Sequence, residues 1–168
     1  MNPCYDAIDR EDFSDNEGNH LLVALYFCNS DYKLNTLHIP EEFAYIKVVD
    51  IDITKAYVDR PINPSVFFRM STWLMQMFMD FKDAIFTFIC SLDELETNHP
   101  EILPQNYRWV LFDRLYQRLP DKSAINVQDI IIGPDDFKSY GRAFYHDQQA
   151  PIVHIVVDYL KEKQQQYQ

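Results

Sequence analysis

Glycine is scarce in this chain, with three residues among 168. Glycine-rich loops that cradle phosphate groups, and frequent tight hairpin turns with positive φ angles, are therefore not expected. The sequence also has no Gly-x-Ser-x-Gly elbow, no His-Glu-x-x-His pattern and no Cys-x-x-Cys spacing. It thus lacks the usual signatures of nucleotide-binding proteins, α/β-hydrolases and zinc proteins.

Basic residues are also few, since 15 Lys and Arg stand against 26 Asp and Glu, for a net charge of −11. Affinity for nucleic-acid phosphates depends on clustered Lys and Arg, so this balance argues against nucleic acid as a partner. A strongly acidic chain stays soluble and also suits docking to a basic protein.

The three cysteines, Cys4, Cys28 and Cys90, are odd in number and lack metal-binding spacing, which is typical of reduced thiols. The first residues have neither the basic nor the apolar segment of an export signal. No apolar run approaches the ~18 residues that a membrane span requires. We therefore expect a soluble, cytoplasmic protein that contacts no membrane, and no feature calls for a cofactor.

The most distinctive segment is an apolar helix beginning after Asn63, a good N-cap, with Pro64 at its first position. Only five residues between positions 66 and 81 are polar. Four of these share one narrow stripe: Arg69, Thr72, Gln76 and Asp80. A helix with so small a polar face must be covered on nearly all sides, by its own sheet or by another protein.

Apolar periodicity outlines the remaining elements. Strands are predicted over 20–28, 32–39, 45–54, 84–90, 125–132 and 137–146, and a further helix over 105–119. The first three strands are expected to form an antiparallel meander. Strand 84–90, apolar at nearly every position, is expected inside the sheet after a parallel crossover. Residues 150–164 fit a helix or a strand, and Pro151 with the lysines near position 162 favours the helix.

The predicted fold class is α+β: a mainly antiparallel sheet of five or six strands packs on the central apolar helix, with two further helices. Residues 1–19 are predicted to be a mobile acidic tail, 20–164 a single domain, and 165–168 a polar fraying end. The strand ending in Cys90-Ser91-Leu92-Asp93 and the later Leu111-Phe112 resemble a family of small bacterial α+β domains of uncharacterised function. That resemblance implies the fold and no particular activity.

Two sets of residues are candidates for chemistry. Asp50 and Asp52 alternate along one strand, and Asp93 with Glu94 follows another. If the four carboxylates converged, they would suit Mg²⁺ and a hydrolase or nuclease reaction. Otherwise Asp50 and Asp52 belong to a solvated strand face.

Cys90 is the second candidate, as a nucleophile served by one of three histidines: His99, His146 or His154. The nearby carboxylates would raise the pKa of the thiol, which favours a small buried apolar role. His154 and Asp158, four residues apart, suggest a metal site or, more simply, a surface ion pair.

Four of the five methionines lie in the central helix: Met70, Met75, Met77 and Met79. Methionine adapts its shape to a partner, so Met70, Trp73 and Met77 are candidate contact residues, although a core helix would look the same. A second candidate contact is the acidic loop with Asp93, Glu94 and Glu96, which could meet a basic protein.

These features predict a small non-catalytic binding or regulatory module that acts through protein contacts. Its partner would be another protein or a second copy in a homodimer. Two alternatives stay open. One is the metal-dependent hydrolase or nuclease at Asp50, Asp52, Asp93 and Glu94. The other is a small-molecule-binding domain whose abundant Tyr and Phe line a pocket.

Overall fold

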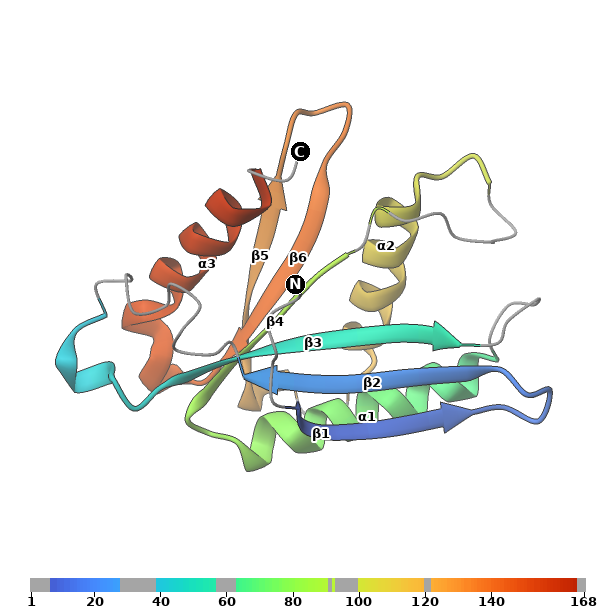
Figure 1. The fold of residues 1–168 in the computed structure, drawn as a ribbon, viewed down its shortest axis with the longest axis horizontal. Coiled ribbons are helices and arrows are strands. Elements are labelled where there is room, and N and C mark those ends of the chain that lie inside the picture. The colour runs from blue at the N-terminus through green and yellow to red at the C-terminus, as the bar shows by residue number, and fades with distance from the viewer. Residues whose placement is uncertain are drawn as a thin grey trace.

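The structure is a computed structural model that describes residues 7–27, 39–56, 63–90, 92, 100–119 and 122–165. Within these residues one six-stranded sheet has the order β1-β2-β3-β4-β6-β5, and three α-helices pack against it (Figure 1). The strands are β1 (Ala7–Ser14), β2 (His20–Phe27), β3 (Lys47–Ala56), β4 (Ala84–Ile89), β5 (Asn126–Ile132) and β6 (Ser139–Tyr145). The helices are α1 (Pro64–Asp80), α2 (Pro104–Gln117) and α3 (Ala150–Gln165). The predicted α+β class is confirmed.

The crossover through α1 creates the parallel pairing of the sheet. Helix α1 joins β3 to β4, and these two strands are parallel neighbours, whereas the other four described pairings are antiparallel. Strand β4 lies between β3 and β6, as its nearly continuous apolar sequence predicts.

Helices α1 and α2 cover one face of the sheet. Val66, Met70 and Phe78 of α1 pack into a cluster with inward side chains of β2, β3 and β4. The Phe78 ring contacts the rings of Phe86 and Phe144, with centroids 4.8 and 4.6 Å away. The predicted polar stripe of α1 faces solvent: Arg69, Thr72, Gln76 and Asp80 are all exposed.

Helix α3 covers the other face, over β4, β6 and β5. Its residues Ile152, Val153, Val156 and Val157 are buried and form a second cluster with apolar residues of these strands, Ile85, Ile130 and Ile132 among them. Residues 150–164 are therefore helical, which is the alternative that Pro151 favoured over a strand. Proline fits the first turn of a helix because the first N–H groups have no intrahelical acceptor.

The predicted mobile tail over 1–19 is wrong for residues 7–14, which form edge strand β1 paired with β2. Phe13 is buried, and its ring meets the ring of Trp73 edge-on, with centroids 6.0 Å apart. The acidic composition misled the prediction because an edge strand can place charged side chains in water on both sides and still form its ladder bonds.

The predicted strand over 32–39 falls almost entirely outside the described residues. Strand β2 pairs directly with β3 along its whole length, so no strand lies between them in the sheet. The three-stranded antiparallel meander therefore exists, but its members are β1, β2 and β3.

The β5–β6 hairpin depends on two glycines. Gly133 begins the turn Gly133-Pro134-Asp135-Asp136, between the two predicted strands, with φ of +98°, a conformation that other residues rarely adopt. Gly141 lies so close to β4 that a β-carbon at this position would collide with the carbonyl oxygen of Phe88. Within the described residues, no helix has both the length and the apolar character needed to cross a lipid bilayer.

Candidate functional site

The methionine-rich helix is used mainly inside the molecule. Met70, predicted as a partner contact, is fully buried against the sheet, so that prediction is wrong for the folded chain. Trp73 and Met77 are partly buried and pack against the same core cluster. The other predicted contacts, Asp93, Glu94 and Glu96, lie outside the described residues.

The carboxylates of β3 lie on the sheet face opposite α1. Asp50 pairs across the sheet with Tyr26 on β2 and with Thr87 on β4, and Asp52 is exposed two residues further along the strand. Burial raises the pKa of Asp50 to about 6; the Lys163 ammonium opposes this and the Asp52 carboxylate adds to it. With this pKa the Asp50 carboxyl is mostly ionised near neutral pH, and burial makes that ionised form costly.

The metal alternative needs four carboxylates, and only two of them are described. Among the described residues, no three His, Cys, Asp or Glu side chains gather closely enough to hold a metal ion. Asp93 and Glu94 lie outside those residues, so their convergence with Asp50 and Asp52 stays a prediction.

Cys90 lies just after β4, with its backbone N–H bonded to the carbonyl of Tyr140 at 2.7 Å. Burial raises the pKa of its thiol to about 12, although the guanidinium groups of Arg108 and Arg142 oppose the shift. The thiol is therefore protonated at neutral pH. The sequence predicted a poor nucleophile from neighbouring carboxylates; in the structure the larger cause is loss of solvent.

Two of the candidate histidines lie on different elements and in different surroundings. His146 is buried, and its Nε2 lies 2.7 Å from the carbonyl oxygen of Phe78, which joins the end of β6 to α1. His154 and Asp158 are both exposed on α3. His99 lies outside the described residues.

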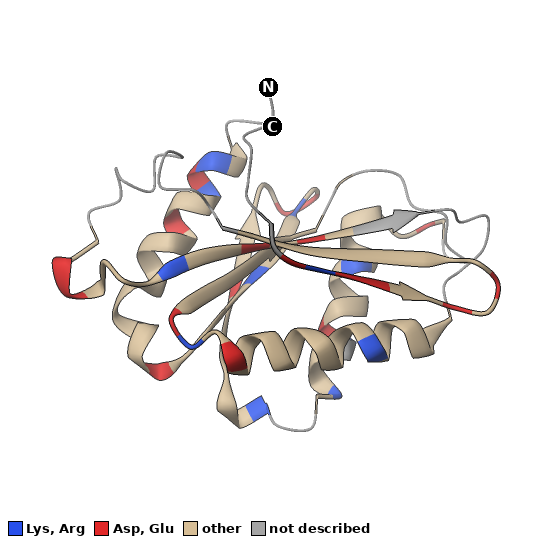
Figure 2. Cartoon of the chain, turned by 60° about the horizontal axis from the view of Figure 1, so that its bottom comes forward, with Lys and Arg blue, Asp and Glu red and all other residues tan. Residues whose placement is uncertain are grey.

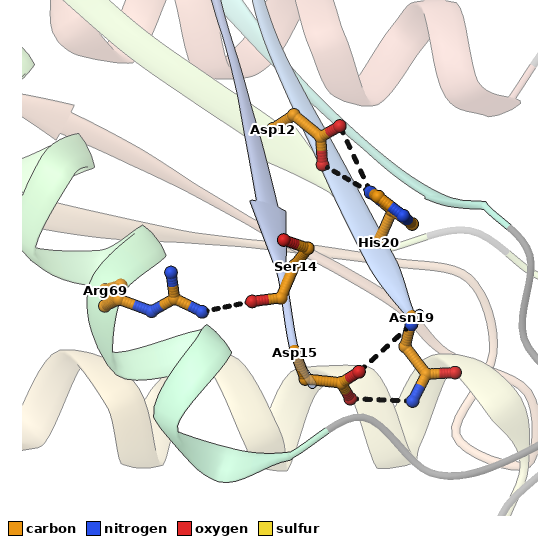
Figure 3. Close-up of polar contacts among 6 residues, drawn as sticks. All are labelled: Asp12, Ser14, Asp15, Asn19, His20 and Arg69. Atoms are coloured by element: carbon orange, nitrogen blue, oxygen red, sulfur yellow. Dashed lines mark hydrogen bonds and ion pairs between the residues drawn. The ribbon is translucent and has the colours of Figure 1, made fainter. Parts of the chain in front are cut away.

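The β1–β2 turn is held by polar contacts that sequence reasoning assigned to a tail (Figure 3). The Asp15 carboxylate accepts hydrogen bonds from the side chain of Asn19 at 2.6 Å and from its backbone N–H at 3.0 Å. Asp12 contacts the Nδ1 atom of His20 at 3.0 Å. Arg69 of α1 donates a hydrogen bond to the carbonyl of Ser14 at the end of β1. These contacts connect β1, β2 and the turn between them, and join the end of β1 to α1.

Sequence reasoning missed a buried arginine between α2 and the β5–β6 hairpin. Arg142 donates from Nε to Asp129 at 2.8 Å and from Nη2 to Asp113 at 2.9 Å. Its guanidinium carbon lies 4.6 Å from the centre of the Trp109 ring and 5.1 Å from that of Tyr116. The available signal was a charged residue on the inward side of a strand, opposite a helix with Trp109, Asp113 and Tyr116 at i, i+4 and i+7.

The Arg142 network supports a surface that we call the α2–β5 surface, formed by Trp109, Asp113, Asp129, Ile131 and Tyr140. Tyr140 is paired with Ile131 in the sheet, and its ring stacks on Trp109 with centroids 5.3 Å apart. Ile131 is 47% exposed, and the side chains of Asp129 and Asp113 are 44% and 38% exposed. A half-exposed apolar side chain thus lies beside two carboxylates on packed elements.

Four of the aromatic residues that could line a small-molecule pocket pack against one another. Phe88 lies within 6.0 Å of Phe144 and 5.3 Å of Phe112, measured between ring centroids, and Tyr116 lies 6.1 Å from Phe144. These rings form the layer between α2 and the sheet, which makes them core residues.

Comparison of the chain with protein-family models, with curated proteins and with solved structures finds no match in any of the three.

Proposed function

We propose that this chain is a small, non-catalytic binding module that acts through contact with another protein, at the α2–β5 surface. The observation that carries the proposal is the pair Asp129 and Ile131. These two side chains, two residues apart, lie on the same side of β5. Ile130 and Ile132 lie on its other side and are buried under α3. The strand therefore presents an apolar group and a charge in fixed positions.

Mixed apolar and charged character suits a protein interface. Interface cores bury apolar and aromatic side chains, while charges around them set orientation and association rate. The Arg142 network fixes the carboxylates before any partner arrives, so less side-chain freedom is lost on binding. Trp73 and Met77, the other two candidate contact residues on α1, already pack against the core. They therefore offer less exposed surface for a partner to bury.

The test compares two exposed apolar residues in different parts of the molecule. Ile131→Glu places a charge on the α2–β5 surface, whereas Phe68→Ser removes an apolar side chain that is 58% exposed on α1. The tagged full chain and both variants are used to capture proteins from the native source, with quantitative mass spectrometry. We expect the same proteins with the wild type and Phe68→Ser, and at least an approximately tenfold loss with Ile131→Glu.

Capture that is lost with Phe68→Ser and kept with Ile131→Glu would contradict the location of the site. Capture of nothing above the level of the tag alone would contradict the function. Because Ile131→Glu alters an edge strand, its thermal unfolding is measured beside that of Ile131→Thr, which keeps strand preference while removing apolar surface.

A further inference from the structure

The two edges of the sheet are built differently. Edge strand β1 carries four consecutive charged residues, Asp9 to Asp12, and its pairing with β2 has an irregularity between Ala7 and Asp9. Its final carbonyl, at Ser14, accepts a hydrogen bond from Arg69. Figure 2 shows the charged residues along β1 and at the turn that joins it to β2. Charges, irregular pairing and covering contacts are the features by which proteins prevent a further strand from adding to an edge.

The β5 edge has few of these features. Its seven residues include one charged side chain, Asp129, and end in three consecutive isoleucines. In the described part of the chain, β6 alone pairs with β5, and no backbone hydrogen bond reaches Asn126–Ile132 from another segment. Every second residue of β5 therefore directs a backbone N–H and C=O outward, available to another strand.

The side chains beside this edge indicate what such a strand would carry. Asp129 and Asp113 each give their Oδ1 atom to Arg142, and more than a third of each side chain remains in solvent. One guanidinium against two carboxylates leaves a local charge of −1, in a chain of net charge −11. Ile131, two residues from Asp129 on the same side of the strand, supplies exposed apolar area.

We propose that the β5 edge receives an extended segment of a second protein as a seventh strand, with Lys or Arg beside Asp129 and an apolar residue beside Ile131. This proposal rests on the proposed binding function and names its mode and its partner's chemistry. Backbone hydrogen bonds supply affinity in strand addition, and alternate side chains supply specificity. A second copy of this chain fits less well: two chains of charge −11 repel each other, and antiparallel pairing centred on Asp129 opposes like charges.

The experiment uses the isotopically labelled full chain and a short synthetic peptide in which Thr alternates with Val and Lys. In an extended peptide, Val and Lys two residues apart lie on one side. We expect saturable NMR shifts of the amides in Asn126–Ile132 and none in Ala7–Ser14. Replacing Lys by Glu in the peptide should weaken binding by at least about tenfold, and Asp129→Asn should weaken binding of the Lys peptide while retaining a side-chain oxygen for Arg142.

Two N-methylated peptides separate strand addition from side-chain docking. Alternate amides of an extended peptide point to opposite edges, so methylation of one alternating set should abolish binding while the complementary set binds as before. Equal affinity for both sets would overturn strand addition and leave a protein-binding function intact. Shifts at β1, or concentration-dependent shifts at β5 without peptide, would overturn the chosen edge or the chosen occupant. If no peptide binds at β5, the inference fails, while capture from the native source tests the proposed function separately.

Discussion

The guanidinium of Arg142 lies over the indole ring of Trp109, with its carbon 4.6 Å from the ring centre, and so joins β6 to α2. The same group is bonded to carboxylates from α2 and β5. Helix α2 and the two strands of the β5–β6 hairpin are therefore connected by one side chain that is 6% exposed. Trp109 and Tyr140 are positioned by this contact, and they adjoin the exposed Ile131.

Replacement of Arg142 by lysine should destabilise the fold by about 2 kcal/mol, because an ammonium group cannot present the planar fork that bonds two carboxylates and stacks on Trp109. Urea unfolding followed by circular dichroism measures the change. Arg114→Lys is the matched control, since Arg114 is exposed on α2, the helix that carries Trp109, and it should change stability by less than about 0.5 kcal/mol. Equal unfolding midpoints for the two variants would show that the network contributes little.

Two apolar residues of α1, two positions apart, should respond very differently to truncation. Met70 is fully buried, whereas Phe68 is more than half exposed. Met70→Ala leaves a cavity under the sheet and should cost about 2–5 kcal/mol, while Phe68→Ala should cost less than about 1 kcal/mol. Chemical denaturation of both variants measures the difference. A larger loss for Phe68→Ala would mean that α1 packs on the sheet through another side.

Asp50→Asn should stabilise the protein at neutral pH. The carboxyl titrates near pH 3.9 in the unfolded chain, and burial raises its pKa to about 6 in the fold. Between about pH 4 and pH 6 the folded state binds more protons, so stability falls as pH rises through this window. Above it the full penalty remains, about 3 kcal/mol for a pKa raised by about two units, and the amide removes this penalty because it cannot ionise.

Urea unfolding of Asp50→Asn and of the wild type near pH 3.5, 5 and 7.5 follows this difference. We expect no gain at the lowest pH and the full gain at the highest. Glu42→Gln, at an exposed position, is the control for loss of one negative charge. A gain that is the same at every pH would assign the effect to packing and not to ionisation.

Cys90 should be inert in the native protein. Burial raises the pKa of its thiol to about 12, and the side chain is almost fully enclosed. In a chain with Cys4→Ser and Cys28→Ser, a disulfide reagent at pH 8 should modify Cys90 at least about a hundredfold more slowly in buffer than in denaturing urea. Rapid modification of the native chain would instead point to an accessible thiolate.

The periodicity of apolar residues was sufficient to predict most of the architecture. Helix α1 was evident because four of the five polar residues between positions 66 and 81 share one stripe, and β4 because a strand covered on both faces needs no polar alternation. Strand β1 was not evident. Phe13, which is strongly buried, is surrounded in the sequence by charges that the edge position places in water.

The candidate site was much less accessible to sequence reasoning. Met70 and Trp73 were predicted as partner contacts, yet both pack against the core, because whether a methionine faces its own sheet or a partner depends on the three-dimensional arrangement. Arg142, Asp113 and Asp129 are separated by up to 29 positions, and the pattern around each residue does not specify which partner it meets.

The amino-acid order alone specified where most of the described helices and strands form, since those choices depend on neighbours within a few residues. It also specified the chain's acidity, from which we predict that nucleic acid is not a partner. The folded arrangement decided which strands became edges of the sheet. It also decided which carboxylates lost contact with water and which aromatic rings enclosed Arg142. Burial and charge pairing depend on distances through space, and those distances exist only once β4, β5, β6 and α2 have packed together.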